Sequence, residues 1–168
     1  MTLNDKPITP FSLIYLVVDD KVLLIKRLPS KKLLGSKIIG LGGKVEPGED
    51  ILTSAKREFK EETGLDILNP VFKGTYTWVD TNFIGTSHII VGTEYNGELI
   101  DSNEGELGWY NIDSLKDLEG LAKYQHNFLP DVFENGFHYT GLAFFNGDEL
   151  LSYTDAKPYF ATLSKTNH

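Results

Sequence analysis

Residues Gly43 to Leu65 read GKVEPGEDILTSAKREFKEETGL and join a glycine turn, a helix and a cluster of carboxylates in one short stretch. The helix is expected to begin at Asp50 or Ile51, because an acidic residue there can accept hydrogen bonds from free backbone N–H groups. It is expected to end at Gly64, since glycine readily adopts the left-handed conformation that closes a helix. The stretch therefore predicts a loop–helix–loop unit.

This helix is expected to carry an apolar flank and, beside it, an acidic edge, because successive residues advance by about 100°. The flank is formed by Leu52, Ala55 and Phe59. The acidic edge is formed by Glu58, Glu61 and Glu62. Like charges at this spacing destabilise a helix by roughly 0.2–0.5 kcal/mol per pair unless a cation lies between them. Carboxylate oxygens suit Mg²⁺ or Mn²⁺, so the edge predicts a metal site that can also take substrate phosphates.

The alternative is an ordinary solvent-exposed helix face on which Lys56 and Lys60 screen the acids. The spacing favours the metal site, because every fixed position of the pattern G-x5-E-x7-R-E-U-x-E-E-x-G-U, with U apolar, is filled. This pattern resembles the Nudix box, the signature of the Nudix hydrolases, at residues 43–65. The matching residues are Gly43, Glu49, Arg57, Glu58, Phe59, Glu61, Glu62, Gly64 and Leu65.

The resemblance implies a Nudix fold of the α/β or α+β class, an α/β/α sandwich around a mixed β-sheet, formed by a single domain over residues 1–168. It also implies hydrolysis of a nucleoside diphosphate linked to another group, with Mg²⁺ or Mn²⁺ as cofactor. By position, Glu58 and Glu62 look like the principal metal ligands. Glu61 adjoins them, the carbonyl of Gly42 is a further candidate ligand, and Arg57 would orient the catalytic carboxylates.

Many family members similar to MutT have a further glutamate outside the box that binds metal or acts as a base. Glu104 is the candidate for that catalytic and metal-binding role here. It lies in SNEGELGWYNI, residues 102–112, which resembles the acidic loop and following strand of those members. Glu106 is the near alternative, and a solvent-facing loop carboxylate is the other.

Composition and length agree with a small enzyme. With 168 residues, 40% of them hydrophobic, the chain can build one substantial core. It has no cysteine, which excludes disulfides and thiolate metal sites. The first ten residues are polar, and no segment approaches the roughly 18 apolar residues of a membrane span. We therefore expect a cytoplasmic protein with no membrane partner.

The formal net charge of −8 argues against binding of a nucleic-acid polymer, because such binding depends on Lys and Arg that displace counterions. It does not argue against a free nucleotide as the small-molecule partner, since metal ions and a few cations can hold one locally. By position in the family, Arg27 and Lys44 are the best phosphate-binding candidates, and Lys37 is weaker. The sequence leaves open whether the protein is a monomer or a homodimer.

Runs rich in β-branched and aromatic residues alternate with turn sequences along the rest of the chain. Asp19-Asp20, Thr81-Asn82 and Asn146-Gly147-Asp148 are expected to join neighbouring strands. Leucines at helical spacing predict a further helix over residues 113–123, and another is expected around residues 128–134. The expected strands are residues 11–18, 21–27, 71–80, 86–95, 108–112, 137–145 and 149–154.

This order of elements resembles the MutT-like branch that hydrolyses oxidised purine nucleoside triphosphates such as 8-oxo-dGTP. The resemblance implies release of a nucleoside monophosphate and pyrophosphate, and a role in nucleotide-pool sanitisation and DNA repair. Several enzymes of that branch have Trp-Asn before the glycine turn, where this chain has Ile38-Ile39. An aliphatic residue cannot read a purine oxygen, so base selection must differ. The candidates for contact with the base are Ile39, Trp78, Gln125 and Phe128.

Two other functions remain open at this point. One is hydrolysis of ADP-ribose, another nucleotide sugar or a dinucleoside polyphosphate, which would release no pyrophosphate. The other is a non-catalytic Nudix module that senses a nucleotide. Such modules often have eroded boxes, whereas this box is complete.

Overall fold

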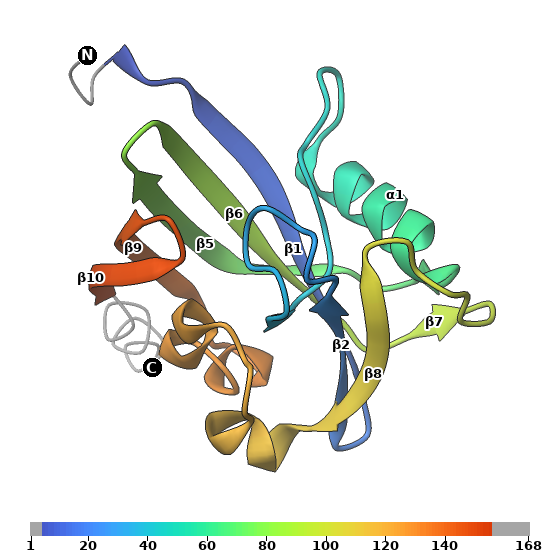
Figure 1. The fold of residues 1–168 in the computed structure, drawn as a ribbon. Helices are drawn as coiled ribbons and strands as arrows, with labels where there is room; N and C mark the ends of the chain where they lie inside the picture. Colours follow the sequence, from blue (N-terminus) through green and yellow to red (C-terminus); the bar gives the residue numbers. More distant parts are fainter. Residues whose placement is uncertain (1–4, 156–168) are drawn as a thin grey trace, which may run out of the picture.

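The computed structural model describes residues 5–155, in which a mixed β-sheet lies between an α-helix and a layer of short 3₁₀ helices (Figure 1). The main sheet has the order β10-β9-β5-β6-β1-β2-β3, and β8 also pairs with β2. The pairs β1–β6 and β5–β9 are parallel, and the other pairs are antiparallel. The strands are β1 Ile8–Val18, β2 Lys21–Arg27, β3 Ile38–Ile39, β5 Val71–Asp80, β6 Phe83–Gly92, β8 Gly105–Asn111, β9 Tyr139–Asn146 and β10 Glu149–Asp155. The short strands β4 Asp66–Ile67 and β7 Tyr95–Asn96 form a separate two-stranded sheet.

The three predicted turns join antiparallel neighbours. Asp19 has a positive φ of 54° in the turn between β1 and β2, and Gly147 has a φ of 61° between β9 and β10. Residues 81–82 connect β5 to β6. The predicted strand pairs are therefore confirmed.

The sheet is buried on both faces, and β1 shows how. Its side chains alternate, so Leu13 and Tyr15 enter one apolar cluster while Ile14 and Leu16 enter the other. The first cluster is shared with the 3₁₀ layer, and the second contains Phe59 of the helix. A strand covered on both sides reads as a continuous apolar run, as residues 13–18 do.

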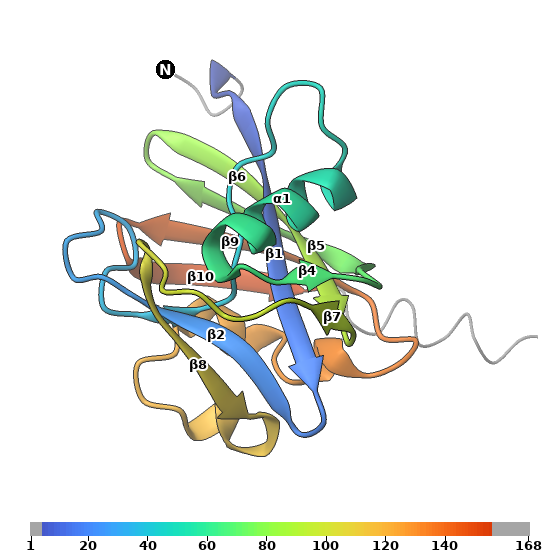
Figure 2. The ribbon, with the colours of Figure 1, turned by 90° about the vertical axis from the view of Figure 1, so that its right-hand side faces the viewer.

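Helix α1, Ile51–Thr63, occupies the predicted position. The side chain of Asp50 accepts hydrogen bonds from the N–H groups of Leu52 and Thr53, and Gly64 closes the helix with a φ of 77°. Both predicted ends are therefore confirmed. Phe59 is fully buried against the sheet, whereas Leu52 on the expected apolar flank is 39% exposed. Figure 2 shows α1 lying across β1.

The expected helices over residues 113–123 and 128–134 are 3₁₀ helices instead: η2 Ile112–Asp117, η3 Lys123–Asn127 and η4 Asp131–Phe133. The leucines at three-residue spacing fit the 3.0 residues per turn of a 3₁₀ helix as well as an α-helix. The N–H of Leu118 donates to the carbonyl of Leu115, and that of Leu121 donates to Leu118. Gly120, with a φ of 88°, also interrupts regular helix. The prediction of α-helices here was wrong.

The glycine loop before α1 is held against β1. The N–H of Ser12 donates to the carbonyl of Gly43 at 2.9 Å, and Leu41 and Ile14 exchange backbone hydrogen bonds. Gly42 has a φ of 133°, and a Cβ there would lie 2.1 Å from the carbonyl oxygen of Ser12. Only glycine fits this position, so the loop brings its backbone close to the carboxylates of α1.

Candidate active site

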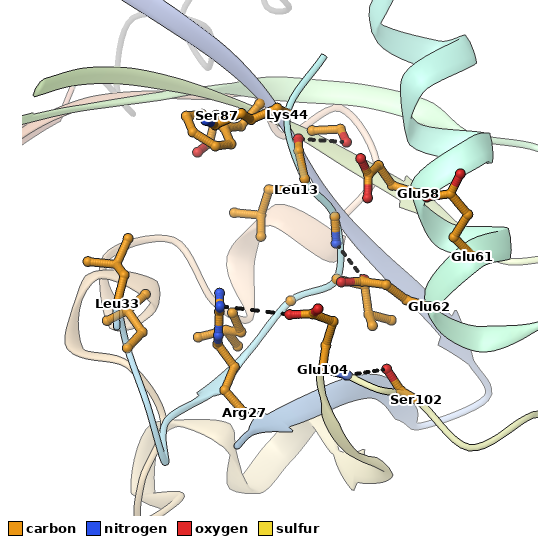
Figure 3. A pocket seen from close by; sticks show the side chains of 18 of the residues that line it. Leu13, Arg27, Leu33, Lys44, Glu58, Glu61, Glu62, Ser87, Ser102 and Glu104 are labelled. Atoms are coloured by element: carbon orange, nitrogen blue, oxygen red, sulfur yellow. Dashed lines mark hydrogen bonds and ion pairs between the residues drawn. The ribbon is translucent and has the colours of Figure 1, made fainter. Parts of the chain in front are cut away.

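A cavity of about 560 Å³ joins the glycine loop and α1 to the face of the sheet that the 3₁₀ layer covers (Figure 3). Its acidic end is lined by Gly42, Gly43, Glu58, Glu61, Glu62 and Glu104. Its aromatic end is lined by Phe11, Tyr76, Trp78, Tyr124 and Phe145. Arg27 and Lys44 also line it and supply positive charge.

Arg57 holds three carboxylates of the box. Its Nε and Nη2 donate to the two oxygens of Glu49 at 2.6 and 2.9 Å, which is a bidentate pair. Its Nη1 donates to Glu58 at 2.9 Å and to Glu61 at 3.3 Å, and Nη2 also reaches the carbonyl of Lys44. The hydrogen bonds that Arg57 donates to Glu49 lower the pKa of Glu49 and raise the pKa of Arg57. Arg57 therefore ties the helix to the loop before it.

Glu62 is the buried carboxylate of the site. Its Oε2 accepts a hydrogen bond from the N–H of Gly42 at 2.9 Å (Figure 3). Burial, with smaller contributions from the charges of Glu58 and Glu104, raises the pKa of Glu62 to about 7. Burial also raises the pKa of Glu58, because desolvation outweighs the opposing effect of Arg57. Both carboxylates are thus held where their negative charge is poorly compensated by the protein.

The acidic end fits a hard divalent cation. Its donors are oxygen atoms, which Mg²⁺ and Mn²⁺ prefer, and a cation beside Glu62 would stabilise the ionised form that burial disfavours. The side chain of Glu58 is only 17% exposed, whereas that of Glu61 is 59% exposed. Within residues 5–155, however, no three acidic, histidine or cysteine groups already stand in a metal-binding arrangement. Hydrogen bonds to Arg57 hold two of the predicted ligands, Glu58 and Glu61.

Glu104 reaches the same corner from the loop before β8. Figure 3 shows it facing Arg27 with Glu62 close by. Its Oε2 lies 2.6 Å from Nζ of Lys31 and 3.9 Å from Nη2 of Arg27. The alternative, Glu106, is exposed on β8 and lies outside the cavity lining. The structure therefore brings Glu104, and not Glu106, to the box.

The predicted substrate-binding residues divide into two groups. Arg27, Lys44, Ile39 and Trp78 line the cavity. Gln125 and Phe128 do not line it, and both are fully buried.

Gln125 is occupied inside the protein. Its Oε1 accepts hydrogen bonds from the hydroxyl of Tyr15 at 2.6 Å and the N–H of Gly40 at 3.0 Å. Its Nε2 donates to the carbonyl of Ile38 at 2.9 Å. Phe128 packs in the apolar cluster, with its ring 5.1 Å from that of Tyr139. Gln125 therefore links η3 to the segment that leads into the glycine loop and lies outside the cavity lining.

Several cavity residues were missed from the sequence. Phe11 and Ser87 face the cavity from paired positions on β1 and β6. Asp80 lies at the end of β5, on the same face as Trp78. Leu33, Leu34 and Phe145 complete the lining, and Phe145 lies on β9, which pairs with β5 beside Trp78 and Asp80. The two-residue alternation from Trp78 to Asp80 was the signal that could have found Asp80.

A model of the NUDIX domain matches residues 9–132, which is most of the chain and includes the whole box. The chain belongs to the Nudix family. Enzymes of this family are hydrolases that generally use divalent metal ions and act on nucleotide substrates.

Three relatives illustrate the similarity in sequence. The chain is 35% identical over 109 residues to the uncharacterized Nudix hydrolase YvcI of Bacillus subtilis, covering 61% of this chain and 66% of YvcI. It is 35% identical over 78 residues to the oxidized purine nucleoside triphosphate hydrolases of Danio rerio and Mus musculus, covering 45% of this chain and 50% of each relative. The chain therefore spans between half and about two thirds of the length of these relatives.

Solved structures give the same family. A MutT protein from Bacillus halodurans is similar with a TM-score of 0.78 and 30% identity, over 88% of this chain and 97% of that one. A MutT protein from Methanosarcina mazei has a TM-score of 0.69 at 23% identity, over 77% and 95% of the chains, and shows the fold alone. The predicted Nudix fold around a mixed sheet is confirmed. Among residues 5–155, no helix combines the length and hydropathy that a membrane crossing needs.

Proposed function

We propose that this Nudix hydrolase converts a nucleoside triphosphate to a nucleoside monophosphate and pyrophosphate, with an oxidised purine nucleotide such as 8-oxo-dGTP as the favoured substrate. The observation that carries the proposal is that one cavity has carboxylates at one end and aromatic rings at the other. Such a cavity suits a ligand with a charged polyphosphate and a flat base. The oxidized purine hydrolases among its relatives support the same substrate class.

The box residues would act at the phosphate end. A divalent cation bound by Glu58 and Glu62, with Glu61, Glu104 and the carbonyl of Gly42 as further ligands, would neutralise phosphate charge and lower the pKa of an attacking water. Arg57 would keep the carboxylates in position through the hydrogen bonds that it already makes.

Positive side chains would hold the polyphosphate. Arg27 lines the cavity beside Glu104 of the acidic end, and Lys44 lines it beside Phe11, with which it forms an isolated β-bridge. Nε of Arg27 is buried and has no hydrogen-bond partner among the described residues. Because an unpaired buried donor is costly, a phosphate oxygen would be a favourable partner for Arg27. Glu104, 3.9 Å from Arg27, would act from the same corner as a metal ligand or base.

The aromatic end would hold the base. Trp78 offers an indole face, and Phe11 lies beside it with a ring-centre distance of 5.6 Å. Ile39 would contribute apolar contact. Base–aromatic stacking is worth about 1–3 kcal/mol, enough to fix the orientation of the nucleotide.

A second candidate is hydrolysis of a nucleotide-linked diphosphate such as ADP-ribose or a dinucleoside polyphosphate. Relatives named NAD-capped RNA hydrolase NudC favour it, because one of them, from Vibrio atlanticus, is 28% identical over 80% of this chain. Cleavage of such substrates would yield phosphorylated fragments without pyrophosphate.

The test is a Mg²⁺-dependent hydrolysis panel of 8-oxo-dGTP, the ordinary dNTPs, ADP-ribose, NAD and a dinucleoside polyphosphate, ranked by kcat/KM with the products identified. Preference for 8-oxo-dGTP with release of pyrophosphate is the expected result. Preference for a linked diphosphate would replace the leading function by the second. No turnover of any substrate would overturn both and favour a nucleotide-sensing module.

A further inference from the structure

Asp80 lines the aromatic end of the cavity and is not among the residues that the sequence predicts to contact the base. Tyr76, Trp78 and Asp80 share one face of β5 because side chains alternate along a strand, and all three line the cavity. Residues two apart on a strand are separated by about 7 Å. A base that stacks on Trp78 therefore presents its edge near the carboxylate of Asp80.

The indole of Trp78 is fixed in orientation. It lies over Gly85 of β6, where a Cβ would come within 2.4 Å of the ring. Its Nε1 donates to the hydroxyl of Ser87 at 3.3 Å. The rings of Phe11 and Phe83 lie 5.6 and 5.0 Å away. A ring fixed in this way defines the plane of the base and thus where its polar edge points.

The carboxylate of Asp80 is anchored through one oxygen only. Oδ1 accepts hydrogen bonds from the N–H of Thr81 at 2.7 Å and the N–H of Gly147 at 3.4 Å, with a long contact to the Thr81 hydroxyl. Lys6 donates to the backbone carbonyls of Asp80 and Thr81 rather than to the carboxylate. Within residues 5–155, no hydrogen bond is made to Oδ2, so one oriented acceptor remains for a ligand.

The wall around Trp78 is largely apolar, and its other polar groups include the hydroxyl of Tyr76, which has no hydrogen-bond partner among the described residues. Leu33, Leu34, Ile39 and Phe145 are apolar, and the hydroxyl of Ser87 is engaged by Trp78. An ionised carboxylate only accepts hydrogen bonds, so its partner must present N–H donors. The base edge of guanine has an N1–H beside an exocyclic amino group, whereas adenine has an acceptor beside its amino group. Oxidation at position 8 leaves the guanine edge unchanged.

We propose that Asp80 is the base-reading residue of this cavity and that it selects purines with adjacent N–H donors, as on guanine and 8-oxoguanine. The inference rests on the proposed hydrolysis of nucleoside triphosphates and names the base. It would also supply a polar contact to the base in a chain that has Ile38-Ile39 before its glycine turn, where neither side chain can form hydrogen bonds.

The test compares dGTP with dITP, which lacks the exocyclic amino group, and with dATP. In the wild-type protein, kcat/KM for dGTP should exceed that for each analogue by about tenfold or more, because a site built for hydrogen bonds rejects a ligand that lacks them. In Asp80→Asn these ratios should fall to about threefold or less. Asparagine keeps an acceptor for Thr81 and Gly147 but places an amide donor against the donors of guanine. Asp117→Asn, an exposed aspartate at the end of η2, is the matched control and should keep the wild-type ratios.

Two results would overturn the inference. One is a wild-type protein that hydrolyses dGTP and dITP equally well. This comparison uses only the wild type, so it does not depend on whether a variant folds. The other is a folded Asp80→Asn protein with unchanged ratios. Hydrolysis of triphosphates without base discrimination would contradict only the role of Asp80, whereas no hydrolysis of any triphosphate would contradict the proposed function itself.

Discussion

The two ends of the cavity differ in how well the free protein stabilises them. At the acidic end, burial disfavours the charges of Glu58 and Glu62, and the raised pKa of each carboxyl records that cost. At the aromatic end, Phe11, Trp78 and Phe83 pack against one another with ring-centre distances of 5.0 to 6.0 Å. The acidic end thus gains from a bound cation, while the aromatic end is a rigid surface in the free protein. Mutations at the acidic end should therefore change mainly the catalytic step, and mutations at the aromatic end should change mainly the binding of the base.

Glu62→Gln should have the largest effect, at the acidic end. Removing a charged metal ligand should lower kcat by on the order of a thousandfold, because metal ions supply several kcal/mol of transition-state stabilisation. Steady-state kinetics with Mg²⁺ measures the loss, and circular dichroism checks the fold. Wild-type turnover in a folded variant would refute the role of Glu62.

The same variant should be more stable than the wild type when metal is removed by a chelator at pH 8. The pKa of Glu62 is raised from an ordinary 4.5 to about 7 in the folded state. Below both values the carboxyl is protonated in the folded and the unfolded protein, so it does not change the stability. As the pH rises from about 4.5 to 7, only the unfolded state ionises freely, and the free energy of unfolding therefore falls. The gain from Gln should be on the order of 3 kcal/mol at pH 8 and about 1 kcal/mol at pH 5.

Thermal melts of wild type and Glu62→Gln at the two pH values measure this difference. Glu94→Gln, at an exposed position, is the control and should show no such dependence on pH. Equal melting temperatures at pH 8 would show that the acidic end is not electrostatically strained.

Arg57→Lys should have an intermediate effect. Lysine keeps the charge but cannot make the bidentate pair with Glu49 while also reaching Glu58. Loss of groups that orient metal ligands typically costs 10–100-fold, so kcat/KM should fall by about that factor and Mg²⁺ affinity should weaken. Lys56→Ala on the same helix is the control. A fall no larger than the control's would mean that the network around Arg57 is only structural.

Trp78→Leu should have the smallest effect and should act at the aromatic end. Loss of a stacking surface should lower kcat/KM by about tenfold, mainly through KM. Trp109→Leu changes the other tryptophan, which lies on β8 outside the cavity lining, and should leave KM unchanged. A loss of kcat in Trp78→Leu as large as that in Glu62→Gln would break the separation between the two ends.

The acidic end could be predicted from the sequence because its determinants are local. Asp50 and Gly64 set the ends of α1, and the spacing of Glu58 and Glu62 places them on one edge of it. The contact of Gly42 with Glu62 follows from the glycine loop that precedes the same helix.

The aromatic end could be predicted only in part, because strands distant in sequence build it. Phe11 and Ser87 come together through the parallel pairing of β1 with β6, which no local pattern encodes. Gln125 was expected at the base because it is polar. In the fold its amide instead satisfies buried groups such as the hydroxyl of Tyr15.

The central claim is that one cavity holds phosphates at the box and a base at Trp78. The most direct measurement is kcat/KM of wild type and Trp78→Leu for the preferred nucleoside triphosphate and for ribose 5-triphosphate, which has no base. Removing the base should lower kcat/KM by about tenfold more in the wild type than in Trp78→Leu, because the contact between the base and the indole of Trp78 is lost only in the wild type. Equal losses in both proteins would show that the base binds elsewhere and would contradict this account.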